Sequence, residues 1–227
     1  MPKVLIADKL RARAAEIFVQ RGVEVEVATG LSEEELIARI GDYDGLAVRS
    51  ATKATAAVLE TGGKGRLRVV GRAGIGVDNI DVAAATANGI VVMNTPYGNA
   101  VTTAEHAIAM MFSVARQIPA ADRSTQAGKW EKSKFMGQEL SGKTLGVIGC
   151  GNIGSIVCDR AQGLRMKVIA YDPFLSADRA KDLGVDKVEL EELLGRADII
   201  TLHVPLTDQT RGMLDAKALA KCRKGVL

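Results

Sequence analysis

Short apolar runs alternate with segments of helical periodicity along the first part of the chain. The apolar runs predict strands at residues 4–7, 23–27, 45–48, 67–70 and 90–93. Between them, apolar positions three and four residues apart predict helices at residues 11–21, 36–40, 54–60 and 82–88. Ser32 and Glu35 form a capping-box pattern before one of these helices. Strands separated by single helices are typical of βαβ units with a parallel sheet.

The alternation is interrupted after residue 97 and restarts at residue 144. The interruption contains a long helix, expected at about residues 103–116, and a polar segment, residues 117–143, in which we expect no regular structure. The second series predicts strands at residues 144–148, 167–171 and 198–202, and a further strand beginning at 225–227. Its helices are expected at residues 152–163, 177–183, 190–194 and 215–222. We therefore predict two α/β domains, residues 1–97 and 98–227.

A glycine pattern lies where the second series begins. Gly149, Gly151 and Gly154 form Gly-x-Gly-x-x-Gly directly after an expected strand and at the start of an expected helix. In this context the first glycine permits a tight turn, the second admits a pyrophosphate, and the third lets the helix pack on the strand. The helix would direct its first N–H groups, near Asn152 and Ile153, towards the phosphates.

An aspartate in the expected position completes the nucleotide pattern. Asp172 ends the next predicted strand, eighteen residues after Gly154. Its carboxylate would accept hydrogen bonds from the adenosine ribose and repel a 2′-phosphate, and Pro173 and Phe174 bring no cation. The pattern therefore predicts NAD in preference to NADP. Residues 204–207 follow another strand at the same edge; they either line the nucleotide pocket or simply leave the strand.

Composition narrows the possible partners. The net charge is +3 and aromatic residues make up 4% of the chain, which argues against a nucleic-acid-binding surface. No apolar run approaches the roughly 20 residues of a membrane span. The three cysteines show no metal-ligand spacing, so we expect no metal site, and their low number favours a reducing, cytoplasmic location.

Several segments resemble the D-2-hydroxyacid dehydrogenase family, in particular its members that act on 3-phosphoglycerate. They are residues 48–53, 71–81, 94–99, 103–105, 128–131, 135–137, 149–154 and 201–207. The resemblance implies a flavodoxin-like substrate domain followed by a Rossmann NAD-binding domain. It also implies hydride transfer between C2 of 3-phosphoglycerate and NAD, a step of serine biosynthesis. Residues 117–143 would form an arm through which two copies pair as a homodimer or higher homo-oligomer.

The resemblance also implies roles for individual residues. The expected cofactor contacts are Gly149, Gly151, Asn152, Ile153, Gly154, Asp172, Pro173, His203, Val204, Pro205, Thr103 and Ile75. The expected substrate contacts are Arg49, Ser50, Arg72, Gly74, Ile75, Gly76 and Asn99. Among these, residues 74–76 would offer backbone N–H groups to the substrate carboxylate, and the two arginines would hold its phosphate. Relatives commonly have threonine at positions 75 and 204, so only backbone contacts are expected there.

The family's catalytic arginine, glutamate and histidine would follow the segment that residues 221–227 resemble. We therefore expect no catalytic residue within residues 1–227 and a catalytically incomplete chain. Of the two histidines, His106 is expected to pack against the sheet and His203 to lie at a strand end, both in structural roles. Two alternatives stay open: a dehydrogenase of another D-2-hydroxyacid, such as glyoxylate or a lactate analogue, and a non-catalytic NAD-binding protein.

Overall fold

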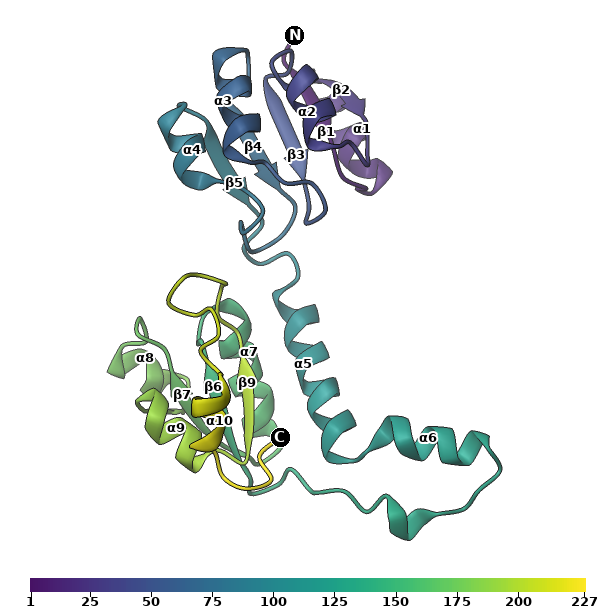
Figure 1. Cartoon of the computed structure of the whole chain (residues 1–227), viewed down its shortest axis with the longest axis vertical. Coiled ribbons are helices and arrows are strands. Elements are labelled where there is room, and N and C mark those ends of the chain that lie inside the picture. The colour runs from purple at the N-terminus through teal and green to yellow at the C-terminus, as the bar shows by residue number, and fades with distance from the viewer. The chain divides into compact units, whose positions relative to one another are not determined.

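The computed structural model describes all 227 residues and divides into two compact units. The first unit contains Met1–Asn99 and the second contains Ala100–Leu227. The sequence analysis placed this boundary at residue 97. Each unit is built on its own parallel sheet (Figure 1). None of the helices combines the length and the apolar character that crossing a membrane requires.

The first unit has a five-stranded sheet in the order β2-β1-β3-β4-β5, with every pair parallel. The strands are β1 (Lys3–Ile6), β2 (Glu24–Val27), β3 (Gly45–Val48), β4 (Val69–Arg72) and β5 (Val91–Asn94). The helices are α1 (Ala12–Gln20), α2 (Glu33–Ile40), α3 (Ala56–Lys64) and α4 (Val82–Ala87). This strand order is that of flavodoxin-like folds, so the predicted fold class is confirmed for this unit.

Helix α2 shows how the local sequence sets an element. The Ser32 hydroxyl accepts a hydrogen bond from the Glu35 backbone N–H at 3.2 Å, and the Glu35 carboxylate accepts one from the Ser32 N–H at 2.8 Å. This capping box satisfies two N–H groups at the helix start that have no partner within the helix. Leu36 and Ile40, one turn apart, are both buried against the sheet core. The capping residues and the spacing of the apolar residues therefore both favour a helix at Glu33–Ile40.

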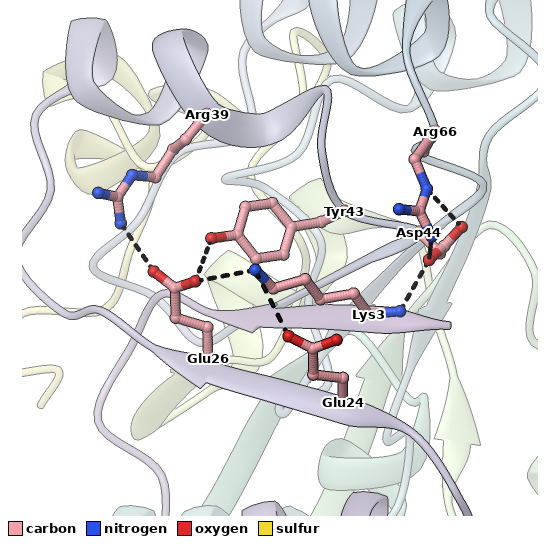
Figure 2. Close-up of polar contacts among 7 residues, drawn as sticks. All are labelled: Lys3, Glu24, Glu26, Arg39, Tyr43, Asp44 and Arg66. Carbon is pink, nitrogen blue, oxygen red and sulfur yellow. Dashed lines mark hydrogen bonds and ion pairs between the residues drawn. The ribbon is translucent and has the colours of Figure 1, made fainter. Parts of the chain in front are cut away.

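A polar network stabilises the edge strand β2 (Figure 2). Its centre is the Glu26 carboxylate, which accepts a hydrogen bond from the Tyr43 hydroxyl at 2.6 Å. Lys3 and Arg39 each place a side-chain nitrogen 3.2 Å from the same carboxylate. Tyr43 is only 3% exposed, and this burial, together with the Glu26 acceptor, raises the pKa of Tyr43 to about 12. The network joins β1, β2 and the end of α2.

A second carboxylate in the same view fixes the start of three strands (Figure 2). Asp44, just before β3, accepts the Lys3 backbone N–H at 2.7 Å. It also accepts two hydrogen bonds from the Arg66 guanidinium, at 2.7 and 3.3 Å. Since Arg66 precedes β4, one side chain ties together the amino-terminal ends of β1, β3 and β4.

The second unit has a four-stranded parallel sheet in the order β8-β7-β6-β9. The strands are β6 (Thr144–Ile148), β7 (Lys167–Tyr171), β8 (Asp186–Lys187) and β9 (Ile199–Leu202). The helices are α5 (Ala100–Ala115), α6 (Ile118–Gln126), α7 (Asn152–Gly163), α8 (Ala177–Asp182), α9 (Leu190–Arg196) and α10 (Ala216–Ala220). Counted within the unit, the strand order 3-2-1-4 is that of the Rossmann fold, which confirms the predicted class.

Both faces of this sheet are covered, as the continuous apolar strands require. Along β6, Leu145 and Val147 point to the core that includes α5 and α7. The alternate residues Gly146 and Ile148 face α9. A Cβ on Gly146 would lie 2.6 Å from a methyl carbon of Leu193, so glycine there lets α9 pack close to the sheet.

Two expectations need correction or refinement. Residues 117–143 are not without regular structure, because α6 and a 3₁₀ helix (Lys132–Lys134) lie within them. No residue of α6 is buried, and residues 122–126 are all polar, so the segment resembles a loop; Pro119 in its first turn was the available signal. Residues 225–227 form no assigned strand. Leu227 nevertheless donates its N–H to the Asp198 carbonyl and accepts one from Ile200, the bonding pattern of a parallel strand beside β9.

The network around Glu26 generates a stability prediction. Tyr43→Phe removes a buried hydroxyl and its bond to a carboxylate, so we expect the free energy of unfolding to fall by about 1 kcal/mol. Tyr97→Phe is the matched control, because Tyr97 is 76% exposed, and we expect a change below about 0.5 kcal/mol. Urea denaturation measures both, and equal effects would contradict the role of the network.

The same pair of variants tests the pH dependence. The pKa of Glu26 lies below its ordinary value, chiefly because of the Tyr43 hydrogen bond and then because of Lys3. A lowered folded pKa stabilises the fold above the ordinary carboxyl pKa, and this stabilisation is lost as the pH falls through the folded value. We therefore expect the difference between wild type and Tyr43→Phe to narrow in acid, and a constant difference would contradict the assignment.

Candidate functional site

The glycine loop between β6 and α7 is shaped by two very close approaches. Gly149 has φ +94°, and a Cβ on it would lie 2.8 Å from the carbonyl carbon and oxygen of His203. A Cβ on Gly154 would lie 1.9 Å from the Gly149 carbonyl oxygen. Both distances are shorter than any real Cβ contact. The loop can therefore pass beneath the residues after β9, and α7 can approach β6, only because these positions have no side chain.

The start of α7 is arranged to receive an anion. Gly151 is the residue before the helix, and no side chain caps the first turn. A Cβ on Gly151 would meet nothing within 4 Å, so this position faces open space. The first turn of a 12-residue helix carries partial positive charge and N–H groups directed outward. Asn152 and Ile153 occupy that turn.

Asp172 follows β7 and is held at the glycine loop. Its carboxylate accepts the Cys150 backbone N–H at 2.7 Å and the Phe174 N–H at 2.8 Å, each on a different oxygen. A carboxylate has about four lone-pair sites, so two remain for the hydroxyls of a ligand. Asp172 is only partly buried, and Pro173 and Phe174 beside it are exposed. The side chain is therefore oriented by the backbone and remains open on one side.

The loop after β9 completes this edge of the sheet. His203 donates its backbone N–H to the Ile148 carbonyl at 2.8 Å, and its Nε2 lies 3.0 Å from the Thr201 hydroxyl. Burial lowers the pKa of His203, which favours the neutral imidazole. Val204 and Pro205 follow directly, with a methyl of Val204 against Gly149. The glycine loop and residues 203–205 thus meet where the strand order reverses, the position at which open α/β sheets bind ligands.

The first unit has a corresponding edge between β1 and β3. Asp8, 5% exposed, accepts the Arg49 N–H at 2.6 Å, the Thr52 N–H at 3.1 Å and the Thr52 hydroxyl at 2.7 Å. Burial alone would raise the pKa of Asp8, but these hydrogen bonds together lower it. Arg49 and Ser50 are exposed above this anchor, and the Arg49 guanidinium reaches the Lys9 carbonyl at 3.5 Å.

Arg72, at the end of β4, binds the protein's own backbone. Its Nε donates to the Arg49 carbonyl at 3.3 Å and its Nη1 to the Gly76 carbonyl, and Asp78 lies 3.4 Å from that nitrogen. The side chain is only 11% exposed. Arg72 therefore stabilises the turn at residues 74–76 through its bond to the Gly76 carbonyl. Within this turn, the Gly74 N–H donates to the Arg72 carbonyl, so the candidate donors for an anion are those of Ile75 and Gly76.

The predicted residues fall into two groups. The second unit contains Thr103, on α5, and the cluster of Gly149, Gly151, Asn152, Ile153, Gly154, Asp172, Pro173, His203, Val204 and Pro205. The first unit contains Arg49, Ser50, Arg72, Gly74, Ile75, Gly76 and Asn99. One expectation was wrong: the His106 side chain is exposed on α5 instead of packed against the sheet. The helix buries Ala104 and turns Ala107 and Ile108 towards the core, so His106 falls on its outer side.

Two residues that support the candidate site, Asp8 and Asn79, were not predicted from the sequence. Asp8 anchors the loop after β3, and Asn79 donates from its side-chain amide to the Arg49 and Thr52 carbonyls at 2.7 and 2.6 Å. The signal for Asp8 was present, because a polar residue directly after a buried strand of a parallel sheet lies at the ligand-binding edge. Asn79 gave no such signal, since it lies in a loop and acts through carbonyl groups distant in sequence.

These features define a class of protein, an α/β protein whose second unit binds a dinucleotide. Residues 108–227 match the sequence model described as "D-isomer specific 2-hydroxyacid dehydrogenase, NAD binding domain". The chain belongs to the D-isomer specific 2-hydroxyacid dehydrogenase family, and its second unit carries that family's NAD-binding domain.

Relatives and solved structures agree with this assignment. The D-3-phosphoglycerate dehydrogenase of Archaeoglobus fulgidus is 50% identical over 225 residues, 99% of this chain and 42% of the relative. The chain thus spans about two fifths of the length of this curated relative. The NAD⁺-bound 3-phosphoglycerate dehydrogenase of Entamoeba histolytica has a TM-score of 0.81 at 33% identity, covering 99% of this chain and 70% of that one. A glyoxylate reductase from Paecilomyes thermophila has a TM-score of 0.88 at 28% identity, with coverages of 99% and 71%.

The close approach at Gly154 leads to a paired prediction. Gly154→Ala places a methyl group against backbone, so we expect the free energy of unfolding to fall by about 1–3 kcal/mol or more. Gly163→Ala, at the other end of α7, adds a methyl that meets nothing within 4 Å and should stabilise the helix by up to about 1 kcal/mol. Chemical denaturation separates the two. An unchanged stability for Gly154→Ala would mean that the loop approaches less closely than described.

Proposed function

We propose that a protein carrying this chain transfers a hydride between C2 of 3-phosphoglycerate and NAD, giving 3-phosphohydroxypyruvate in serine synthesis. The observation that carries the proposal is Asp172, which is held by the Cys150 N–H beside the glycine loop at the switch point of the second sheet. The names of the relatives in Archaeoglobus and Entamoeba support the choice of substrate. The second candidate is reduction of a smaller 2-oxoacid such as glyoxylate. The structural similarity to the glyoxylate reductase from Paecilomyes thermophila supports it.

The second unit would bind the dinucleotide. The N–H groups at the start of α7 suit the pyrophosphate, and Gly151 leaves the space that it needs. Asp172 has lone pairs left for the adenosine ribose hydroxyls, and residues 203–205 would line the adjoining side. Bound NAD supplies the hydride acceptor for the oxidation. Pro173 and Thr103 remain expected neighbours of the nucleotide.

The first unit would bind the substrate. The Ile75 and Gly76 N–H groups would receive its carboxylate, because successive N–H groups in a turn converge on an anion. Arg49, exposed next to Ser50, would hold the phosphate. Since the Arg72 guanidinium binds the Gly76 and Arg49 carbonyls, we propose that it mainly positions the carboxylate turn. Asn99 remains the expected substrate contact at the end of this unit.

Neither histidine of the chain is proposed as the proton-transfer group. His203 Nε2 contacts the Thr201 hydroxyl, and His106 lies on the outer side of α5. General acid–base catalysis requires a group within hydrogen-bond reach of the reacting oxygen. We therefore expect residues 1–227 on their own to bind NADH without turning over 3-phosphohydroxypyruvate.

Asp172 provides the experiment that tests the nucleotide site. Asp172→Asn removes the charge that favours ribose hydroxyls, so we expect the NADH dissociation constant to rise roughly ten- to hundred-fold. Asp159→Asn, on the exposed side of α7, is the matched control and should bind NADH like wild type. Titration of NADH fluorescence measures both, and unchanged affinity in Asp172→Asn would contradict the site.

The same titration with NADPH tests cofactor choice. Wild type should prefer NADH, and Asp172→Asn should narrow the difference because repulsion of the 2′-phosphate is lost. The pKa of the Cys150 thiol is lowered chiefly by its contact with Cys158 and also by the charge of Arg179 on α8, so Arg179 is near the glycine loop. A wild-type preference for NADPH would therefore point to Arg179 as a phosphate ligand.

In the longer protein, NADH oxidation with 3-phosphohydroxypyruvate and with glyoxylate as acceptors decides between the two substrates.

We further propose that two copies pair through residues 117–143. Trp130 and Met136 in this segment are 84% and 73% exposed, and exposed large apolar side chains of this kind mark interfaces. Trp130→Ser should therefore shift the chain from dimer towards monomer in sedimentation velocity. Phe174→Ser, at a residue that is 96% exposed but lies outside the segment, should not. A monomeric wild type would contradict the proposal.

We also infer a reducing, cytoplasmic location, which the three free cysteines support.

A further inference from the structure

Two of the three cysteines are in contact, one in the glycine loop and one in the helix that follows it. Cys150 stands between Gly149 and Gly151, and Cys158 lies two turns into α7. Their sulfur atoms are 3.7 Å apart. The third cysteine, Cys222, lies apart from them, with its thiol on the Ala218 carbonyl. The pair therefore joins the nucleotide loop to the helix that follows it.

The two thiols differ in reactivity. The thiol contact lowers the pKa of Cys150, whereas the same contact and burial raise that of Cys158. Cys150 is also the more accessible of the two, at 9% exposed against 0% for Cys158. A lower pKa and greater access favour attack by Cys150, because the thiolate is the nucleophile. Cys158 would then serve as the resolving thiol.

We propose that Cys150 and Cys158 form a reversible disulfide that weakens nucleotide binding, a regulation that rests on the proposed NAD site. Closing the pair means shortening the sulfur–sulfur distance from 3.7 Å to about 2.05 Å. Gly151, after Cys150, has open space around it, which leaves this side of the loop room to move. Ordinary packing of two small apolar side chains is the alternative, and it predicts no link and no effect on the nucleotide.

The oxidant is a peroxide, and the reaction proceeds in two steps. The Cys150 sulfur attacks hydrogen peroxide, the O–O bond breaks, and one water leaves to give a sulfenic acid on Cys150. The Cys158 sulfur then attacks the Cys150 sulfur, the S–O bond breaks, and the hydroxide leaves as water with the Cys158 proton. Two thiols lose two electrons in total, and the peroxide is reduced to two waters.

The link would reach the nucleotide through the backbone of Cys150. Its N–H donates to the Asp172 carboxylate at 2.7 Å, so drawing the loop towards α7 pulls on the proposed ribose ligand. The same movement changes the loop that opens α7, where the pyrophosphate is proposed to bind. Loss of one hydrogen bond to a charged group is enough to weaken binding by roughly ten-fold or more.

The experiment oxidises the folded 227-residue chain with hydrogen peroxide and measures thiols and NADH affinity together. Trypsin releases both cysteines in one fragment, residues 144–160, and Cys222 in another, so the link appears as a loss of two hydrogens from the first. We expect this loss, with the NADH dissociation constant raised by about ten-fold or more and restored by dithiothreitol. Cys158→Ala should keep its affinity after oxidation and reduction, and Cys222→Ala should behave as wild type.

Several results would overturn the proposal: two intact thiols after oxidation, a link that leaves NADH affinity unchanged, or equal loss of affinity in Cys158→Ala. If Cys158→Ala fails to fold, wild type alone still tests the proposal. A disulfide that weakens NADH binding must itself be less stable when NADH is bound, because the two equilibria are coupled. In a dithiothreitol redox buffer of fixed composition, saturating NADH should therefore lower the fraction of chain that carries the disulfide at equilibrium, and an unchanged fraction contradicts the proposal. Reduced wild type that binds no NADH would instead contradict the proposed function, while the mass of residues 144–160 still reports whether the link forms.

Discussion

The site in the second unit depends on one steric constraint, the contact of backbone with backbone at Gly149 and Gly154. The carbonyl of Gly149 lies where a Cβ of Gly154 would be, and the His203 carbonyl lies where a Cβ of Gly149 would be. These approaches bring the loop after β6, the start of α7 and the end of β9 to one point. The helix N–H groups can then face the same space as the Asp172 carboxylate. Without the two glycines the sheet would still form, but its ligand-binding edge would be spread apart.

Much of this architecture could be predicted from the sequence, because several local signals agree with the final fold. The strands Gly45–Val48, Thr144–Ile148 and Lys167–Tyr171 and the helix Asn152–Gly163 lie at their predicted positions. In these elements, buried apolar runs and glycine turns favour the same structure. The helix Ile118–Gln126 was missed because Ile118 is its only large apolar residue and residues 122–126 are all polar, so the segment resembles a polar loop. An apolar period can be recognised only where several apolar residues recur.

The candidate site was predictable to a different degree in each unit. In the second unit the glycine pattern and Asp172 follow a known spacing within one βαβ unit, so the sequence alone indicates these candidate nucleotide contacts. In the first unit the loop that carries Arg49 depends on Asp8 and Asn79, each separated from it by 30 residues or more in the chain. Only the parallel pairing of β1 with β3 brings Asp8 beneath that loop. The resemblance indicated Arg49 and Arg72 as substrate contacts. Only the structure shows that the Arg72 guanidinium points to the Arg49 and Gly76 carbonyls.

The two units also share a device, a carboxylate after one strand that accepts an N–H from the loop after its neighbour. Asp8 follows β1 and receives the N–H of Arg49 after β3; Asp172 follows β7 and receives the N–H of Cys150 after β6. Their surroundings set them apart. Asp8 is 5% exposed, and Thr52 adds a hydroxyl and an N–H to its acceptor sites, so it serves to hold the loop. Asp172 is open on one side and accepts only backbone N–H groups in the bonds described above. The same interaction therefore supports a loop in one unit and leaves lone pairs for a ligand in the other. It follows that movement of the Cys150 backbone acts on Asp172 directly, whereas Asp8 holds the Arg49 loop in place.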